Sequence, residues 1–201
     1  MFEEMIKRDY HHPCIIIWGL HNEIATYTNA GYDITKAFAN KVRSLDNTRL
    51  ISYASYHPMT DICFSLVDII SINQYFGWYY GEIETWESFL SDFKNRLKKD
   101  KLDDKPIIIS EFGTAALYGE DTFECVKWSE NYQEKLLSHT LKLFYNDPAI
   151  AGCYIWQYCD VRTSKEVGLT RARGFNNKGL VNEYRKPKLS YWAVKKIFEQ
   201  Q

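Results

Sequence analysis

Two runs of three isoleucines constrain the fold of this chain more than any other feature of its sequence. Residues 15–17 lead into a short polar stretch that ends in Glu23, and residues 107–109 lead into one that contains Glu111. A continuous run of β-branched residues indicates a strand buried on both faces, as in a parallel sheet covered by helices. We therefore expect an α/β fold in which each glutamate lies at the carboxyl end of a buried strand.

Strand-like segments alternate with segments of helical periodicity along the chain. The strand-like segments are residues 14–20, 49–57, 68–76, 105–113 and 149–160. Helical spacing of apolar residues is found at residues 34–46, 87–98, 128–145 and 190–200. In the first of these helices the expected inward stripe consists of Ile34, Ala37, Phe38, Lys41 and Val42. The alternation implies a parallel sheet with right-handed crossovers.

The number of strands is too small for a closed barrel. A (β/α)8 TIM barrel has eight strands and about 250 residues, whereas this chain has five strand-like segments in 201 residues, the first of them soon after Met1. We therefore expect a partial (β/α)8 barrel, approximately strands 4–8 with their helices, which spans residues 1–201 without a second domain. The first three strands would lie outside the chain.

The composition argues against several classes of function. A net charge of −1 provides no basic field for nucleic acid and no polybasic patch for a membrane surface. No apolar stretch approaches the ~20 residues of a membrane span, and residues 1–4 do not resemble a signal peptide. The histidines show no metal-ligand spacing. We expect no metal and no cofactor.

The five cysteines are odd in number and show no Cys-x-x-Cys spacing. Cys14, Cys63 and Cys153 lie in or next to apolar runs, which predicts buried and reduced thiols. Reduced thiols favour a reducing compartment, so we expect a cytoplasmic protein.

Glu23 and Glu111 are candidate catalytic residues. A carboxylate at the carboxyl end of a barrel strand lies where this fold builds its active site. Either glutamate alone more simply ends a strand beside solvent. The same pattern occurs twice, 111 − 23 = 88 residues apart, which favours a pair of carboxylates of the kind that glycoside hydrolysis needs.

Several motifs, in order along the chain, resemble glycoside hydrolase family 2. Those around the first glutamate are Arg8, Asp9, His12, Pro13, Trp18, Asn22 and Glu23. The following ones are Asn73, Tyr75, Gly77, Trp78 and Tyr79, then Glu111, then residues 128–133, 155–158, 174–179 and 185–188. Within the family, the middle and last motifs are similar to β-glucuronidases.

The resemblance implies a role for each residue of these motifs. It implies that Glu111 is the nucleophile and Glu23 the acid/base residue, with carboxyls ~5 Å apart. The substrate-binding residues that it implies are Asn22, Asn73, Tyr75, Tyr79, Trp156, Arg171, Arg173, Asn176 and Lys178, with Arg171 and Arg173 as alternatives for one arginine contact. Since Glu23 must be protonated in the free enzyme, apolar surroundings such as Trp18 and the nearby negative charge of Glu111 are expected to raise its pKa. Glu111 must stay ionised, and Tyr75 is the expected hydrogen-bond donor to it. His21 is unusual beside Asn22, and it either crowds the sugar or adds a hydrogen bond.

The function implied is a retaining β-glycoside hydrolase, with terminal β-D-glucuronides as the first choice of substrate. Asn176-x-Lys178 would hold the sugar carboxylate, although by itself Asn176-Asn177-Lys178-Gly179 is simply a turn. A β-galactosidase or β-galacturonidase of the same family is the nearer alternative. A non-catalytic fragment is the other, because the first three strands of the barrel are missing. The resemblance also implies that the family's N-terminal sugar-binding-like and immunoglobulin-like domains are absent. An incomplete barrel edge would also favour homo-oligomers.

Overall fold

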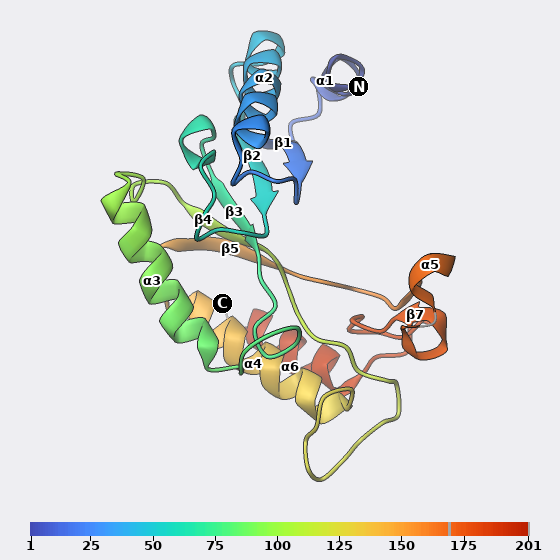
Figure 1. The fold of residues 1–201 in the computed structure, drawn as a ribbon. Coiled ribbons are helices and arrows are strands. Elements are labelled where there is room, and N and C mark those ends of the chain that lie inside the picture. Colours follow the sequence, from blue (N-terminus) through green and yellow to red (C-terminus); the bar gives the residue numbers. More distant parts are fainter. Residues whose placement is uncertain (169, 201) are drawn as a thin grey trace. The chain divides into compact units, whose positions relative to one another are not determined.

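The computed structural model describes residues 1–168 and 170–200, and Figure 1 shows the order of the helices and strands. The chain forms two compact units. The first unit consists of Met1–Asn73 and Ser91–Ser110, and the second consists of Gln74–Leu90 and Glu111–Gln201.

The five predicted strands are all present in one sheet of order β1-β2-β3-β4-β5. They are β1 (Ile17–Asn22), β2 (Leu50–Ser55), β3 (Ile70–Asn73), β4 (Ile107–Phe112) and β5 (Ile150–Ile155). Each is shorter than its sequence pattern suggested. The β1–β2 and β2–β3 pairs are parallel. This sequential order confirms the predicted α/β fold, and the five strands of this sheet are fewer than the eight of a closed barrel.

The predicted helices are also present. They are α2 (Asn29–Leu45), α3 (Thr85–Lys99), α4 (Glu130–Tyr145) and α6 (Leu189–Phe198), and a further helix, α1 (Phe2–Asp9), precedes β1. Shorter elements are η1 (Phe64–Leu66), α5 (Lys165–Gly168), η2 (Ala172–Gly174), and the antiparallel pair β6 (Val161–Arg162) and β7 (Phe175–Asn176). Helix α2 begins where the Thr28 side chain accepts a hydrogen bond from the Gly31 N–H, and α4 where Ser129 accepts from Tyr132. Such side-chain caps satisfy backbone donors that a helix leaves free at its start.

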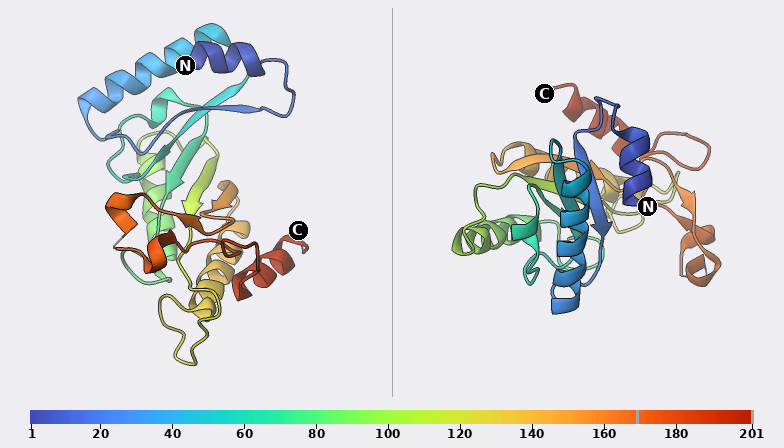
Figure 2. Two further views of the ribbon diagram at one scale, coloured as in Figure 1. Left: turned by 90° about the vertical axis from the view of Figure 1, so that its right-hand side faces the viewer. Right: turned by 90° about the horizontal axis from the view of Figure 1, so that it is seen from above.

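The inward face of α2 differs from the predicted stripe. Its buried residues are Gly31, Thr35, Ala39 and Val42. Ile34 is 45% exposed, and Phe38 packs against Phe2 of α1 with ring centroids 5.1 Å apart; Figure 2 shows α1 and α2 side by side. The reason is steric, because a Cβ on Gly31 would lie 2.1 Å from the Ala25 carbonyl oxygen. The close approach of this backbone selects small residues for the inward face.

Strand β1 is not buried on both faces, which corrects the prediction. Buried Trp18 and Leu20 alternate with less buried residues, and Ile16 just before the strand is 68% exposed. In the strand order β1 has only β2 as a neighbour, whereas β3 lies between two strands and is buried at every residue.

The first residues of β1 are held by Asp46, which follows α2. Its carboxylate accepts hydrogen bonds from Trp18 Nε1 (2.9 Å), the Thr48 N–H (2.8 Å) and Arg49 Nη1 (2.7 Å). Trp18 therefore packs near the beginning of β1, whereas Glu23 follows its end. The prediction that Trp18 surrounds Glu23 is wrong.

The second unit contains α4 and α6, which lie side by side (Figure 1). Its aromatic core includes Trp86 and Phe144, with ring centroids 4.9 Å apart, and Phe112, 5.0 Å from Phe144. Burying an aromatic side chain of this size contributes about 1.5–3 kcal/mol. Because Phe112 ends β4, this core also anchors the strand segment that carries Glu111.

All five cysteines are free thiols, and Cys63 is buried. Cys14 is exposed, so the prediction of a buried thiol is wrong at that position. Among the described residues, none of the helices has both the length and the apolar character needed to cross a bilayer. In the same part of the chain, no group of His, Cys, Asp and Glu side chains is arranged to hold a metal ion.

Candidate active site

Glu23 lies directly after β1 in the first unit. The register of the β1–β2 pair shifts between Gly19 and Asn22, and the Glu23 N–H then donates to the Ala54 carbonyl at 2.9 Å. Glu23 has a φ of +54°, a left-handed conformation that costs a non-glycine residue roughly 1–2 kcal/mol. The irregular strand end thus places a carboxylate in a strained backbone position, which is common at functional sites.

Asn73, at the end of β3, holds the Glu23 carboxylate. Its Nδ2 donates to Glu23 Oε1 at 2.8 Å and to Asn22 Oδ1 at 3.1 Å. Its Oδ1 accepts a hydrogen bond from Ser110 Oγ at 2.7 Å. Because the amide oxygen is engaged by Ser110, the amide nitrogen is the group that faces the carboxylate. The structure thus brings three predicted site residues together and adds Ser110, for which the sequence contained no signal.

His21 takes no part in this cluster. Its Nε2 lies 2.9 Å from Thr35 Oγ1 of α2, and its ring stacks on Tyr53 with centroids 4.5 Å apart. Burial lowers the pKa of His21 to about 4, so the ring is neutral near pH 7. His21 therefore packs between β1 and α2 and contacts Thr35 and Tyr53, not the residues of the Glu23 cluster.

Glu111, the fifth residue of β4, is paired with Tyr75 in the second unit. The Tyr75 hydroxyl donates to Glu111 Oε2 at 2.6 Å, and the Gln74 N–H donates to the Glu111 carbonyl at 2.9 Å. A phenol donor at this distance makes a strong, charge-assisted hydrogen bond with an ionised carboxylate. The expected contact between Tyr75 and Glu111 is thus present.

Lys178 is a buried cation at the centre of an aromatic cluster in the second unit. It is 1% exposed, and its Nζ donates to Tyr79 Oη at 2.8 Å. The same Nζ lies 5.5, 5.4 and 4.7 Å from the ring centroids of Tyr75, Trp78 and Tyr79. No carboxylate of the described residues lies within the 4.0 Å of an ion pair with it. The chain thus buries an ammonium group among aromatic rings and one phenol.

Arg171 adds a second cation to this cluster. Its Nη2 donates to Tyr79 Oη at 3.2 Å. Burial would raise the pKa of Tyr79, but the hydrogen bonds from Arg171 and Lys178 outweigh it and lower that pKa below its usual value. Burial also lowers the pKa of Lys178, while the Tyr79 hydrogen bond and the negative charge of Glu111 oppose this shift.

Arg173 and Trp156 are placed differently from the Lys178 cluster. Arg173 is exposed, its Nη2 is paired with Glu183 Oε1 at 2.8 Å, and its guanidinium lies over Phe175. Of the two alternatives, the structure therefore brings Arg171 and not Arg173 to Tyr79. Trp156 follows β5, is 40% exposed, and its backbone N–H donates to the Phe112 carbonyl at 2.8 Å.

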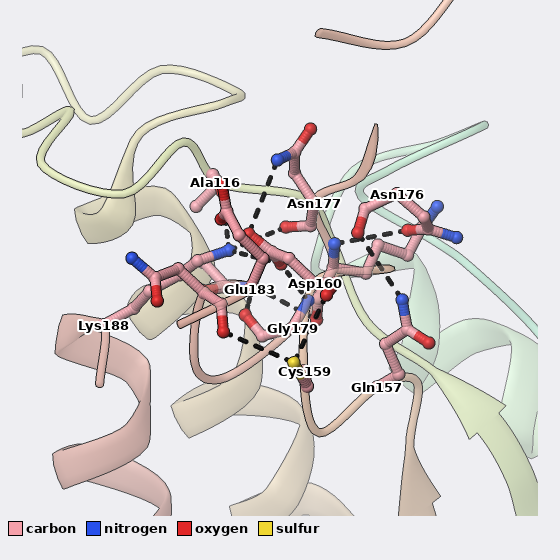
Figure 3. Close-up of polar contacts among 12 residues, drawn as sticks. Ala116, Gln157, Cys159, Asp160, Asn176, Asn177, Gly179, Glu183 and Lys188 are labelled. Carbon is pink, nitrogen blue, oxygen red and sulfur yellow. Dashed lines mark hydrogen bonds and ion pairs between the residues drawn. The ribbon is translucent and has the colours of Figure 1, made fainter. Parts of the chain in front are cut away.

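The segment that carries Lys178 is held by contacts within the second unit (Figure 3). The Lys178 N–H donates to Asn176 Oδ1 at 3.2 Å, so this amide oxygen serves the turn. A Cβ on Gly179 would lie 2.3 Å from the Asp160 nitrogen, which requires glycine there. Asp160 and Lys188 form a buried ion pair of 2.9 Å beneath the segment. Sequence reasoning missed this pair, because its members are 28 residues apart and have no local signal.

A sequence model of glycosyl hydrolases family 2, TIM barrel domain, matches residues 1–201. The chain is 32% identical over 208 residues to a β-glucuronidase of Homo sapiens, and the alignment covers 96% of this chain and 31% of that protein. It is 31% identical over 193 residues to a β-glucuronidase of Paenibacillus borealis, and this alignment covers 94% of this chain and 31% of that protein. The chain spans about a third of the length of the curated relatives that it matches.

Solved structures agree with this assignment. The chain is similar, with a TM-score of 0.94 and 38% identity, to a GH2 β-galacturonidase from Eisenbergiella tayi bound to galacturonate, covering 100% of this chain and 36% of that one. It is also similar, with a TM-score of 0.87 and 32% identity, to a Ruminococcus gnavus β-glucuronidase in complex with D-glucuronic acid, covering 100% and 35%. These findings confirm the predicted partial α/β barrel. The chain belongs to glycosyl hydrolases family 2 and matches the TIM barrel domain of that family throughout.

Proposed function

We propose that this chain carries the catalytic residues of a retaining β-glycoside hydrolase that acts on terminal β-D-glucuronides. One observation carries the choice of an acidic sugar: the buried ammonium of Lys178, with Arg171 nearby, has no carboxylate partner among the described residues. A cation buried without a counter-ion is unfavourable unless an anion joins it. The C6 carboxylate of a uronic acid is such an anion, whereas the hydroxymethyl group of a neutral hexose is not.

In the proposed mechanism Glu111 attacks the anomeric carbon while protonated Glu23 donates its proton to the glycosidic oxygen. The bond to the leaving group breaks, and a covalent glycosyl-enzyme forms through Glu111. Glu23, now ionised, takes a proton from water, which attacks the anomeric carbon and releases Glu111. This chemistry requires the two carboxyls to lie about 5–5.5 Å apart.

The neighbouring residues support these roles. The Tyr75 hydroxyl, 2.6 Å from Glu111 Oε2, stabilises an ionised carboxylate and keeps it oriented. The Asn73 amide bonds to both Glu23 and Asn22, and this supports the proposed role of Asn22 in bonding the sugar 2-hydroxyl as the transition state forms.

A β-galacturonidase is the second candidate, and a specific observation favours it. The chain is 38% identical to the Eisenbergiella tayi β-galacturonidase and 32% identical to the Ruminococcus gnavus β-glucuronidase. Glucuronic and galacturonic acid carry the same carboxylate and differ in configuration at C4. Lys178 would therefore serve either sugar, and the contacts to the 4-hydroxyl would choose between them.

The substrate class is tested with aryl β-glucuronide, β-galacturonide and β-galactoside on the full-length protein, with Lys178→Ala as the variant. We expect hydrolysis of a uronide to exceed that of the galactoside in the wild type, and Lys178→Ala to reduce this preference. Preference for the galactoside, unaltered by Lys178→Ala, would defeat the proposal. Preference for the galacturonide would select the second candidate. Running the same assay on residues 1–201 alone tests the alternative of a non-catalytic fragment.

The two glutamates are separated by chemical rescue. With an activated aryl glycoside, Glu111→Gln should lose several orders of magnitude in rate, whereas Glu23→Gln should still form the glycosyl-enzyme. Azide should rescue both variants. We expect the inverted glycosyl azide from Glu111→Gln and the azide of retained configuration from Glu23→Gln. The opposite pattern would mean that the roles are reversed.

A further inference from the structure

The buried ion pair of Asp160 and Lys188 is hydrogen-bonded to the backbone on both sides of Lys178. Lys188 is 0% exposed, and its Nζ makes three hydrogen bonds: to Ala116 O (2.7 Å), Asp160 Oδ1 (2.9 Å) and Asn177 O (2.9 Å). An ammonium group has three donors, so Lys188 is fully satisfied by these acceptors. Figure 3 shows them converging from separate segments of the chain.

Each member of the pair holds one neighbour of Lys178. Lys188 Nζ donates to the carbonyl of Asn177, which precedes Lys178. Asp160 Oδ1 accepts a hydrogen bond at 2.8 Å from the N–H of Gly179, which follows Lys178. The backbone of Lys178 is therefore fixed from both sides by one ion pair.

A third side chain completes the support. Gln133 of α4 donates from Nε2 to the carbonyl of Gly179 at 3.2 Å and to that of Thr114 at 2.9 Å. Its Oε1 accepts a hydrogen bond from Ser190 at 2.8 Å. The segment around Lys178 is thus joined by buried polar contacts to both α4 and α6.

We propose that Asp160 and Lys188 are positioning residues for uronate recognition: by holding the peptide groups on either side of Lys178, they fix its ammonium where it distinguishes an acidic from a neutral sugar. This inference rests on the proposed function. Neither side chain touches the sugar in this arrangement. A buried ion pair adds little net stability compared with apolar residues of similar size, so the geometry it imposes on Lys178 accounts for its presence better than stability does.

The test compares selectivity and not activity alone. The measured quantity is the ratio of kcat/KM for an aryl β-uronide to kcat/KM for the matching neutral aryl β-glycoside, in the full-length protein. Asp160→Asn keeps the shape of the side chain but removes its charge. The double variant Asp160→Asn/Lys188→Met leaves no unpaired buried charge and guards against a variant that fails to fold. Circular dichroism checks the fold of each variant.

We expect both variants to lower the ratio about tenfold or more, as loss of a residue that orients a binding group commonly does. In a Lys178→Met background the same substitutions should leave the ratio unchanged, because the group that they position is gone. Val194→Ala, a buried change in α6, is the control, and it should lower stability without changing the ratio.

Two results would overturn the inference. One is an unchanged ratio in a folded Asp160→Asn or double variant, and the other is an equal fall of the ratio in the Lys178→Met background. Failure of the proposed function looks different: there Lys178→Met itself would leave the ratio unchanged.

Discussion

Replacing Lys178 by methionine should make the protein more stable while it weakens recognition of an acidic sugar. The Lys178 ammonium has three donors and the structure satisfies one of them, through Tyr79 at 2.8 Å. An unsatisfied buried donor costs about 1–3 kcal/mol. Attraction to the three aromatic rings at 4.7–5.5 Å returns about 0.5–2 kcal/mol. The two unsatisfied donors together cost about 2–6 kcal/mol. After the attraction to the rings is subtracted, the balance predicts that Lys178→Met raises the free energy of unfolding by about 3 kcal/mol.

The gain should depend on pH in a defined direction. Burial lowers the pKa of Lys178, so the folded protein releases this proton at a lower pH than the unfolded chain does. Below the lowered pKa both states are protonated and the wild type bears the full cost of the buried charge. As the pH rises from that pKa toward the ordinary lysine value of about 10.4, the cost is relieved in the wild type only. The advantage of Lys178→Met should therefore shrink at high pH.

Urea denaturation at pH 7 and pH 10 measures this difference, with Lys196→Met, an exposed lysine of α6, as the control. The control should change the free energy of unfolding by less than about 0.5 kcal/mol. A Lys178→Met variant that is less stable than the wild type at pH 7 would refute the reasoning. It would show that the aromatic cluster stabilises the ammonium by itself, and that no anion is needed to account for it.

Three further predictions concern single side chains. Tyr75→Phe removes the 2.6 Å hydrogen bond to Glu111. Loss of a hydrogen bond to a charged group costs about 1.5–3 kcal/mol, which should lower kcat/KM about tenfold to a hundredfold. An effect below about threefold in steady-state assays would show that the phenol is dispensable. Arg171→Gln should lower kcat/KM for a uronide at least about fivefold, as loss of one hydrogen bond of about 1 kcal/mol does. Arg173→Gln should leave it nearly unchanged, because that guanidinium pairs with Glu183 and not with Tyr79; equal effects of the two variants would contradict the placement. Burial would raise the pKa of Asp46, but its hydrogen bonds outweigh this effect and hold the pKa well below its usual range. Asp46→Asn should therefore destabilise the protein at pH 7, and progressively less as the pH falls below about 4. A loss of stability that does not depend on pH in urea titrations would count against this account.

Sequence reasoning was most successful where the signal was local. The runs at 15–17 and 107–109 predicted strands because β-branched residues favour extended backbone, and β1 and β4 are found there. Glu23 and Glu111 were placed at or after strand ends by the same local pattern. Family motifs, which record residues that act together, predicted the contact between Tyr75 and Glu111.

Burial depended on the neighbours that each element acquires. Ile16 is exposed although it belongs to an isoleucine run, because β1 has one neighbour in the strand order. Helix α2 turns Gly31 inward and leaves Ile34 exposed, because the helix packs too closely against the Ala25 backbone for a side chain at Gly31. Hydrophobicity along a sequence says which residues favour burial, but the packing of elements decides which of them achieve it.

The sequence by itself determined the strand–helix order, the family and the residues available for catalysis, since each of these is recorded in local pattern or motif. Only the tertiary structure decided that Lys178 is buried against Tyr79, that Arg171 and not Arg173 joins it, and that Asp160 pairs with Lys188. The physical reason is that a charged side chain is buried only where distant segments together supply its partners. Lys178 is 99 residues from Tyr79 in the sequence, and Lys188 is 28 residues from Asp160. A local sequence pattern therefore cannot predict either contact.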